Sequence, residues 1–512
     1  MTTRDGMRLA HWAKTQPDVL AVQSNWGDRT FAALNANSNR LARALRARGM
    51  KAGDGVAIVC GNRPEFAEAV HACLRAGLRY TPVNWHLKPE EVAYILQDSE
   101  SKAVFGDARF SDLLREASNL EDRASIRLAI GGSVPGFEPY DEAIAEQDRR
   151  DLEDPVPGFR MLYTSGTTGK PKGVVRPLHY ATGLTALTAA PRYEPGGTQL
   201  HLCTGPMHHG GPLVYSMCVP IAHGVGTVLM DRWDAAEALK LIALHGITHT
   251  HMVPTMFHRL LRLPEEVRKS ADISSLRYVA HGAAPCTVAI KRAMIEWFGP
   301  ILWEYYAASE GGGASVSPEQ WLEKPGTVGK PITDDHVRIL DDTRAPCEPY
   351  QPGTIYLKVL EGSDFQYFND PEKTAAAHYG DYFTVGDVGY LDEEGFLFLT
   401  DRSADLIVRG GVNVYPAEVE AVLLQHPAVR DAAVVGVPDE EWGEEVKGVV
   451  EQLDDAIGDR DVETELLEFC RARLARFKCP RSIDIVDKLP RSDNGKLYKR
   501  RLRDAYRGAI DA

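Results

Sequence analysis

Residues 163–173 read YTSGTTGKPKG and follow the apolar residues Met161 and Leu162. The stretch contains three glycines, four serine or threonine hydroxyls and two lysines. A strand that leads into such a loop suits a polyphosphate, because glycines let backbone N–H groups approach the anion while the hydroxyls and lysines meet its oxygens. The GxxxxGK[ST] spacing of a Walker A loop is absent. A solvated turn is the alternative interpretation, but eleven residues in this order favour a phosphate-binding loop.

Short apolar runs alternate with helical patterns on both sides of this loop. Pro64 can begin a helix that Gly77 ends, and a helix that begins at Asp234 should end at Gly246. Strands that alternate with helices predict an α/β fold of layered, mostly parallel sheets, whose ligands lie beyond the carboxyl ends of the strands. The runs that predict buried strands are 56–60, 103–105, 127–130, 227–230 and 278–280.

The length of 512 residues is too great for a single core, so two or more domains are expected. After about residue 400 the expected elements become shorter and form a compact α+β unit. We therefore predict a large N-terminal domain of layered α/β sheets, residues 1–401, and a small mobile α+β C-terminal domain, residues 402–512.

Composition excludes several classes of protein. The net charge of -14 and the lack of a basic stripe argue against a nucleic-acid partner. The eight cysteines have no CxxC or zinc spacing, which predicts free thiols in a reducing cytoplasm. The N-terminus lacks the apolar region of a signal peptide, and the most apolar stretch, residues 210–230, is interrupted by prolines. We expect no transmembrane segment there but a core helix followed by a strand. The sequence leaves the oligomeric state open, and a homodimer is one of the states it allows.

Four further motifs follow the phosphate loop along the chain: YYAASE at 305–310, VGD at 385–387, DR at 401–402 with GGVNVYPAEVE at 410–420, and PRSDNGK at 490–496. In this order the five motifs resemble those of the adenylate-forming superfamily, which includes acyl-CoA synthetases, luciferases and peptide-synthetase adenylation domains. The resemblance covers essentially the whole chain and is strongest to the branch of acyl-CoA synthetases and fatty-acid–CoA ligases. Val385, Ala307, Ser309 and Ala404 depart from the residues usual in the family.

The resemblance implies a site for ATP. Tyr306 would stack on adenine, Ser309 would reach the α-phosphate, and Asp387 and Arg402 would bind the ribose hydroxyls. The residues that would line the other side of the adenine are Gly282, Ala283, Ala284 and Pro285. The residues that would hold the β- and γ-phosphates are Thr164, Ser165, Gly166, Thr167, Thr168, Gly169 and Lys172. Each of these residues could instead be an ordinary turn, surface or core residue, but their occurrence together in this order favours an ATP site.

Three residues would act on the reacting groups. By resemblance, Glu310 would hold magnesium, which prefers carboxylate oxygens and phosphates. Lys496 would bridge the attacking carboxylate and the α-phosphate, two anions that require a cation between them. His209 would stand between the adenylate and the acyl group, although a lone histidine is as readily structural. Small residues close to these motifs suggest a roomy apolar acyl pocket, with loop flexibility as the alternative: Gly210, Gly211, Ala307, Ala308, Gly311, Gly312 and Gly313.

The second half-reaction, thiolysis by coenzyme A, would use the C-terminal domain. By resemblance, Gly410 and Gly411 would line the pantetheine tunnel, and Trp442 would lie near the CoA entrance together with Phe477 and Lys478. Trp442 could equally be a packing residue. The domain would rotate between the two half-reactions about residues near Ala404, where the departure from the family leaves the hinge position open.

These residues predict an ATP-dependent acyl-CoA synthetase, an AMP-forming acid–thiol ligase. It would convert a small-molecule carboxylic acid, ATP and CoA to acyl-CoA, AMP and pyrophosphate through an acyl-adenylate. The acid would be of medium or long chain, or a bulky alicyclic or aromatic acid. One alternative is an acyl-AMP ligase or an adenylation enzyme that feeds a carrier protein. The segment 207–209 lacks the aspartate of amino-acid adenylation domains. A second alternative is a non-catalytic ligand-binding homologue.

Overall fold

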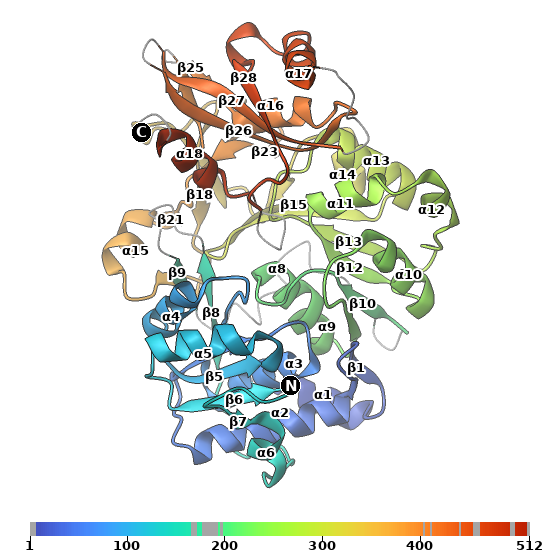
Figure 1. Ribbon diagram of the computed structural model, residues 1–512, viewed down its shortest axis with the longest axis vertical. Helices are drawn as coiled ribbons and strands as arrows, with labels where there is room; N and C mark the ends of the chain where they lie inside the picture. The colour runs from blue at the N-terminus through green and yellow to red at the C-terminus, as the bar shows by residue number, and fades with distance from the viewer. Residues whose placement is uncertain are drawn as a thin grey trace.

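The computed structural model describes residues 7–164, 171–176, 193–194, 198–402, 405–409, 412–439, 442–453, 461–491 and 497–508. Two large sheets with their helices make up the lower and middle parts of the molecule in Figure 1, and the C-terminal residues gather at the top. None of the helices in these ranges has the length and apolar character that a membrane crossing requires.

The first sheet carries the phosphate loop between two of its strands. Its central strands are parallel, whereas β9 joins β8 and β19 joins β9 in antiparallel orientation. The order of its described strands is β19 (Gln366–Tyr367), β9 (Lys172–Val175), β8 (Phe159–Thr164), β4 (Arg79–Pro82), β3 (Gly55–Val59), β5 (Ser101–Asp107), β6 (Ile126–Ile130) and β7 (Glu138–Pro139). The helices in this half are α1 (Arg8–Thr15), α2 (Phe31–Ala47), α3 (Pro64–Ala76), α4 (Pro89–Asp98), α5 (Ser111–Leu120) and α6 (Tyr140–Ala145).

The second sheet is also parallel at its centre. Its described strands run in the order β16 (Lys330–Pro331), β15 (Gly312–Val316), β14 (Leu302–Ala307), β13 (Tyr278–His281), β12 (His249–Met252), β10 (Leu200–Cys203), β11 (Gly226–Leu229), β1 (Leu20–Gln23) and β2 (Arg29–Thr30). An apolar core joins one face of this sheet to four helices: α10 (Ala235–His245), α11 (Pro254–Leu261), α13 (Val288–Phe298) and α14 (Pro318–Glu323). A short helix, α12 (Glu265–Ser270), follows α11. A continuous helical segment of α8 (Gly210–Leu213), a π-helical turn (Val214–Cys218) and α9 (Val219–Ala222) contacts β10 and β12 (Figure 1).

A third, antiparallel sheet leads to the C-terminal residues. Its strands are β20 (His378–Tyr379), β21 (Tyr382–Phe383), β18 (Gly353–Lys358), β22 (Asp387–Leu391) and β23 (Leu397–Arg402), with β17 (Val337–Leu340) beside β18; α15 (Pro371–Ala377) precedes β20. The C-terminal sheet comprises β25 (Val412–Val414), β24 (Ile407–Arg409), β27 (Gly443–Gln452), β26 (Val429–Asp439) and β28 (Ser482–Val486), with helices α16 (Pro416–Leu423), α17 (Val462–Arg471) and α18 (Lys499–Gly508). It has its own apolar core. Strand β23 pairs with β22 as far as Arg402. The third sheet therefore continues one residue past the domain boundary predicted between 401 and 402, and the position of that boundary stays a prediction.

The α/β fold predicted from the sequence is confirmed. Helix α3 begins with Pro64 and ends at Gly77, whose φ of 78° is left-handed, and α10 ends at Gly246 with a φ of 60°. Glycine adopts these angles without the steric cost that a Cβ atom would add. The five apolar runs correspond to β3, β5, β6, β11 and β13, and residues 210–230 form the expected helical segment followed by a strand.

Candidate functional site

Tyr306 and Asp387, both expected at the nucleoside, lie in contact although they belong to different sheets. The Tyr306 hydroxyl, on β14, donates a hydrogen bond of 2.7 Å to Oδ2 of Asp387, at the start of β22, and both side chains are buried. Gly313 makes this possible, because a Cβ atom there would lie 2.6 Å from Cδ1 of the Tyr306 ring. Arg402 stands opposite Asp387 in the register of β22 and β23. A carboxylate has two oxygens that accept several hydrogen bonds, so Asp387 is a suitable acceptor for hydroxyls such as those of a ribose.

The predicted adenine loop, residues 282–285, follows the carboxyl end of β13. A Cβ atom at Gly282 would lie 2.6 Å from the carbonyl oxygen of Tyr305, so the loop packs directly against the residue before Tyr306. Ala283 has a φ of 65°, which is unfavourable for a residue with a side chain. Such a conformation costs about 1–3 kcal/mol and occurs often at ligand sites.

Glu310 and Lys172 share a contact with Tyr367, a residue that the sequence analysis missed. The Tyr367 hydroxyl donates a hydrogen bond of 2.9 Å to Oε1 of Glu310, and Nζ of Lys172 lies 5.2 Å from the centre of the Tyr367 ring. Tyr367 reaches this place because β19 pairs with β9, the strand that begins at Lys172. The sequence contains no signal for this pairing, because a two-residue strand has no recognisable period.

The side chains of Lys172, Tyr367 and Glu310 are partly or fully shielded from water. Burial and the neighbouring Lys373 ammonium lower the pKa of Lys172 to about 8. Burial and the Glu310 carboxylate raise the pKa of Tyr367, so its hydroxyl remains a donor. Glu310 itself is buried. Magnesium prefers one or two carboxylates together with phosphate oxygens, and Glu310 fits this role; no cluster of three or more metal-ligating side chains occurs among the residues described.

The phosphate loop is described only at its two ends. Thr164 pairs with Lys172 across β8 and β9, which brings these two predicted phosphate ligands together. Ser165, Gly166, Thr167, Thr168 and Gly169 lie outside the described residues, as do Lys496, Gly410 and Gly411.

His209 lies at the beginning of α8, where its carbonyl oxygen accepts a hydrogen bond of 3.0 Å from the backbone N–H of Leu213. Its ring is 4.5 Å from the ring of His208, which is buried. His208 in turn meets the edge of Trp85, 6.3 Å away between ring centres. The histidine expected between adenylate and acyl group therefore stands at a helix start, in an aromatic environment.

The small residues around the motifs accommodate neighbouring rings and side chains. A Cβ atom at Gly211 would lie 2.9 Å from Cε1 of His251, and one at Gly311 would lie 2.4 Å from Cζ of Phe383. At Gly210 the neighbour would be Leu162, at 3.0 Å, and at Gly313 it is Tyr306. The prediction that these glycines open a roomy pocket is therefore wrong at these four positions, because side chains from other segments of the fold already fill the space.

Trp442 and Phe477, expected at the CoA entrance, are linked by Arg409. The Arg409 guanidinium lies 5.8 Å from the centre of the Trp442 ring and donates a hydrogen bond of 3.1 Å to the carbonyl oxygen of Phe477. Trp442 is 45% exposed and Phe477 41% exposed. A surface that combines exposed aromatic rings with a cation is suited to a planar, anionic ligand.

A buried ion pair supports the strands that carry the site. Nζ of Lys291, on α13, lies 2.7 Å from Oε2 of Glu304, which is on β14 two residues before Tyr306. The Lys291 ammonium also lies 4.8 Å from the centre of the Trp321 ring. The sequence analysis did not identify this pair, because its members are a lysine in a helical pattern and a glutamate in a strand pattern with no motif around them.

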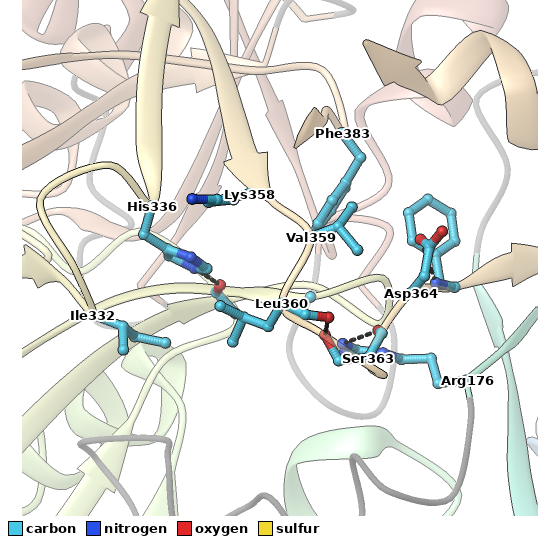
Figure 2. A pocket seen from close by; sticks show the side chains of 12 residues that line it. Arg176, Ile332, His336, Lys358, Val359, Leu360, Ser363, Asp364 and Phe383 are labelled. Carbon is cyan, nitrogen blue, oxygen red and sulfur yellow. Dashed lines mark hydrogen bonds between the residues drawn. The ribbon is translucent and has the colours of Figure 1, made fainter. Parts of the chain in front are cut away.

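A small pocket lies beside Gly311 and Gly312, directly after Glu310 (Figure 2). His336 forms a hydrogen bond of 2.8 Å from Nε2 to the carbonyl oxygen of Gly312, and Arg176 donates one of 2.9 Å to that of Ser363. His336 and Arg176 thus hold backbone carbonyls, and the third basic side chain of the pocket, Lys358, pairs with Asp335.

Comparisons with known proteins agree with the motifs. The AMP-binding enzyme family matches residues 9–359, and the AMP-binding enzyme C-terminal domain matches residues 418–496. The chain is 32% identical over 517 residues to a 2-succinylbenzoate–CoA ligase of Bacillus subtilis, with 100% of both chains covered. It is 31% identical over 489 residues to a long-chain-fatty-acid–CoA ligase of Mycobacterium tuberculosis, with 94% of both covered.

Solved structures resemble the whole chain. The o-succinylbenzoate CoA synthetase of Bacillus subtilis in complex with its acyl-adenylate intermediate is 31% identical, covers 97% of this chain and 98% of its own, and superposes with a TM-score of 0.80. An anthranilate CoA ligase in complex with anthranoyl-AMP has a TM-score of 0.88 at 23% identity, covers 99% of this chain and 98% of its own, and shows that the fold is shared.

Proposed function

Because this chain belongs to the family of AMP-binding enzymes, we propose that it activates a ring-bearing carboxylic acid with ATP and magnesium and transfers the acyl group to coenzyme A. The predicted class, an AMP-forming acid–thiol ligase, is confirmed by the relatives. The observation that carries the proposal is the arrangement of residues 306–310. The Tyr306 hydroxyl bonds to Asp387 and the Tyr367 hydroxyl to Glu310, so the residues proposed for the nucleoside and for the metal lie four positions apart.

In the first half-reaction both reactants are anions, so this chain must supply positive charge and fixed donors. Lys172 and Thr164 would hold the outer phosphates at the end of β8 and β9, while Asp387 would accept the ribose hydroxyls and orient the nucleotide. Magnesium, when bound, neutralises phosphate charge, and Glu310 is the residue that would hold it. Lys496 would place a cation between the carboxylate and the α-phosphate.

In the second half-reaction the thiol of coenzyme A attacks the acyl carbonyl and AMP leaves. The exposed surface of Trp442, Arg409 and Phe477 would receive the nucleotide end of coenzyme A. Gly410 and Gly411, adjacent to Arg409 in the chain, would line the path of its thiol arm. The same C-terminal residues carry Lys496, so the domain would rotate between the half-reactions.

Among acids, a ring-bearing one is favoured over an aliphatic chain. The Bacillus subtilis relative acts on 2-succinylbenzoate and matches this chain from end to end. The fatty-acid ligase of Mycobacterium tuberculosis matches almost as much, so a medium- or long-chain acid is the second candidate.

The experiment is a screen of aromatic, alicyclic and straight-chain acids in which AMP and pyrophosphate are measured with and without CoA. Release of both products that depends on CoA supports the proposal. Acyl-AMP that accumulates and is not consumed by CoA would instead indicate an acyl-AMP ligase that feeds a carrier protein. If no acid gives pyrophosphate, the chain is a non-catalytic homologue.

A reducing cytoplasmic location is also proposed, since all eight cysteines are free thiols and five are buried. Fractionation of cells that express the protein tests this location. The homodimer remains a prediction that light scattering of the purified protein can decide.

A further inference from the structure

Three buried rings stack together on the side of β12 and β14 that faces the helical segment 210–222. The rings of Tyr215 and Tyr305 are 4.7 Å apart between centres, and those of Tyr215 and His251 are 5.4 Å apart and nearly parallel, at 6°. Nε2 of His251 and the hydroxyl of Tyr305 form a hydrogen bond of 2.8 Å. All three side chains are buried. We refer to Tyr215, His251 and Tyr305 as the ring cluster.

The ring cluster meets the three segments expected around the acyl group. A Cβ atom at Gly211, two residues after His209, would lie 3.4 Å from the Tyr305 hydroxyl. A Cβ atom at Gly282, in the adenine loop, would lie 2.8 Å from Cζ of the Tyr305 ring. Ala307, which follows the nucleoside residue Tyr306, packs against the ring cluster as well. The Tyr305 ring therefore occupies the space between the histidine segment, the adenine loop and the residue after Tyr306.

We propose that Tyr305 closes the acyl end of the site, so that the enzyme takes compact ring-bearing acids and excludes long straight chains. This inference rests on the proposed function. An acyl chain that extends past Gly211 would have to displace the Tyr305 ring, which packs directly against Gly211 and Gly282. A compact ring would instead end before it reaches the Tyr305 ring and would leave that ring in place.

Tyr305 is held firmly in this position. Moving its ring would break the hydrogen bond to His251 and the stack with Tyr215 at the same time. Burial lowers the pKa of His251 to about 4, so the imidazole is neutral near pH 7 and the hydrogen bond adds no buried charge. A buried polar group that loses its partner is costly. The ring cluster is accordingly a fixed wall, in contrast to a side chain that swings aside for each substrate.

The test compares ring-bearing acids with straight-chain acids of increasing length, using kcat/KM for AMP formation by the purified full-length chain. The wild-type enzyme should prefer compact ring-bearing acids, and each added methylene beyond the wall should lower kcat/KM by about tenfold or more. Tyr305→Ala should shift the ratio of long-chain to ring-acid kcat/KM upward by at least about tenfold. Tyr305→Phe should retain the exclusion of long chains, because it keeps the ring and removes only the hydroxyl.

Tyr278→Ala is the matched control. Tyr278 is a buried tyrosine on the adjacent strand β13, where it stacks on His249 and Trp303 at 5.8 and 5.9 Å. The atoms nearest to a Cβ atom at Gly211 or Gly282 belong to His251 and Tyr305. Its removal should leave the size preference unchanged. If Tyr305→Ala does not fold, as judged by circular dichroism, Tyr305→Leu replaces it, because leucine fills part of the volume but is shorter than tyrosine.

The outcomes separate the two proposals. The role of Tyr305 would be refuted if the wild-type enzyme used long-chain acids with the same kcat/KM as ring-bearing acids. It would also be refuted if Tyr305→Ala and Tyr305→Leu left the size preference unchanged. In both cases the proposed acyl activation would still stand. Failure of every acid to give AMP in the wild type would remove the proposed function, and the wall with it.

Discussion

Raising the pH from about 7 to about 9 should weaken the use of ATP roughly tenfold, because Lys172 loses its proton in this range. Lys172 is the first residue of β9, is half-buried, and lies beside the Lys373 ammonium and the Tyr367 ring. Burial, which is the larger cause, and the like charge lower its pKa to about 8. The protonated form attracts a polyphosphate and the neutral form does not.

The magnitude follows from linkage between proton and ligand binding. If ATP binds only the protonated form, the apparent kcat/KM for ATP falls by a factor of one plus ten to the power of pH minus pKa. With a pKa of about 8, this factor is about 1.1 at pH 7, about 2 at pH 8 and about 11 at pH 9. Because ATP binding requires the cationic form of Lys172, activity is retained below the pKa of Lys172 and is lost as the pH rises above it.

The assay is ATP–pyrophosphate exchange without CoA, so that the thiol of CoA does not contribute to the pH profile. Lys172→Arg is the control, because a guanidinium remains charged throughout this range. Its profile should stay flat to about pH 9, even if its activity is lower. Lys373→Gln removes the neighbouring charge and should move the decline to higher pH. A decline near pH 8 that Lys172→Arg retains would show that another group titrates, and the assignment of Lys172 would fail.

Further expectations concern the proposed nucleoside contact, the proposed catalytic lysine and the buried ion pair. Tyr306→Phe and Asp387→Asn should each raise the KM for ATP, by a factor equivalent to at most roughly 1.5–3 kcal/mol of binding free energy, the strength of a hydrogen bond to a charged group. The double variant should lose less binding free energy than the sum of the two single losses. Strictly additive losses would mean that the bond between these residues has no part in binding ATP. Lys496→Ala should slow acyl-adenylate formation by about 10²–10³ and spare thiolysis of supplied acyl-AMP, whereas equal loss in both half-reactions would contradict its role. Lys291→Met should destabilise the fold by about 3–5 kcal/mol, because it leaves the Glu304 carboxylate buried without its ion pair. Thermal unfolding measures this loss of stability, and adding Glu304→Gln to Lys291→Met should restore part of the stability. If the double variant is no more stable than Lys291→Met, the loss comes from altered packing and not from the unpaired carboxylate.

The amino-acid sequence was sufficient to predict much of the local structure and the family. Proline at position 64 and glycine at 77 set the ends of α3, because they act on the backbone of their own turn. Apolar runs predicted the buried strands, since a strand enclosed on both faces is apolar along its length. The order of the five motifs predicted an AMP-binding enzyme, because each motif is contiguous in the chain and can be read without its partners.

Contacts between distant segments were decided only by the tertiary structure. The hydrogen bond from Tyr367 to Glu310 joins residues 57 positions apart, and that from Tyr306 to Asp387 joins residues 81 apart. No period in the sequence encodes which strands pair or in which register, and a shift of one residue would turn each side chain to the other face of its sheet. For the same reason the glycines near the acyl group suggested open space, whereas the register of β12, β13 and β14 brings His251 and Tyr305 into it. Side-chain volume is a property of one residue, but free volume depends on every neighbour that the fold brings there.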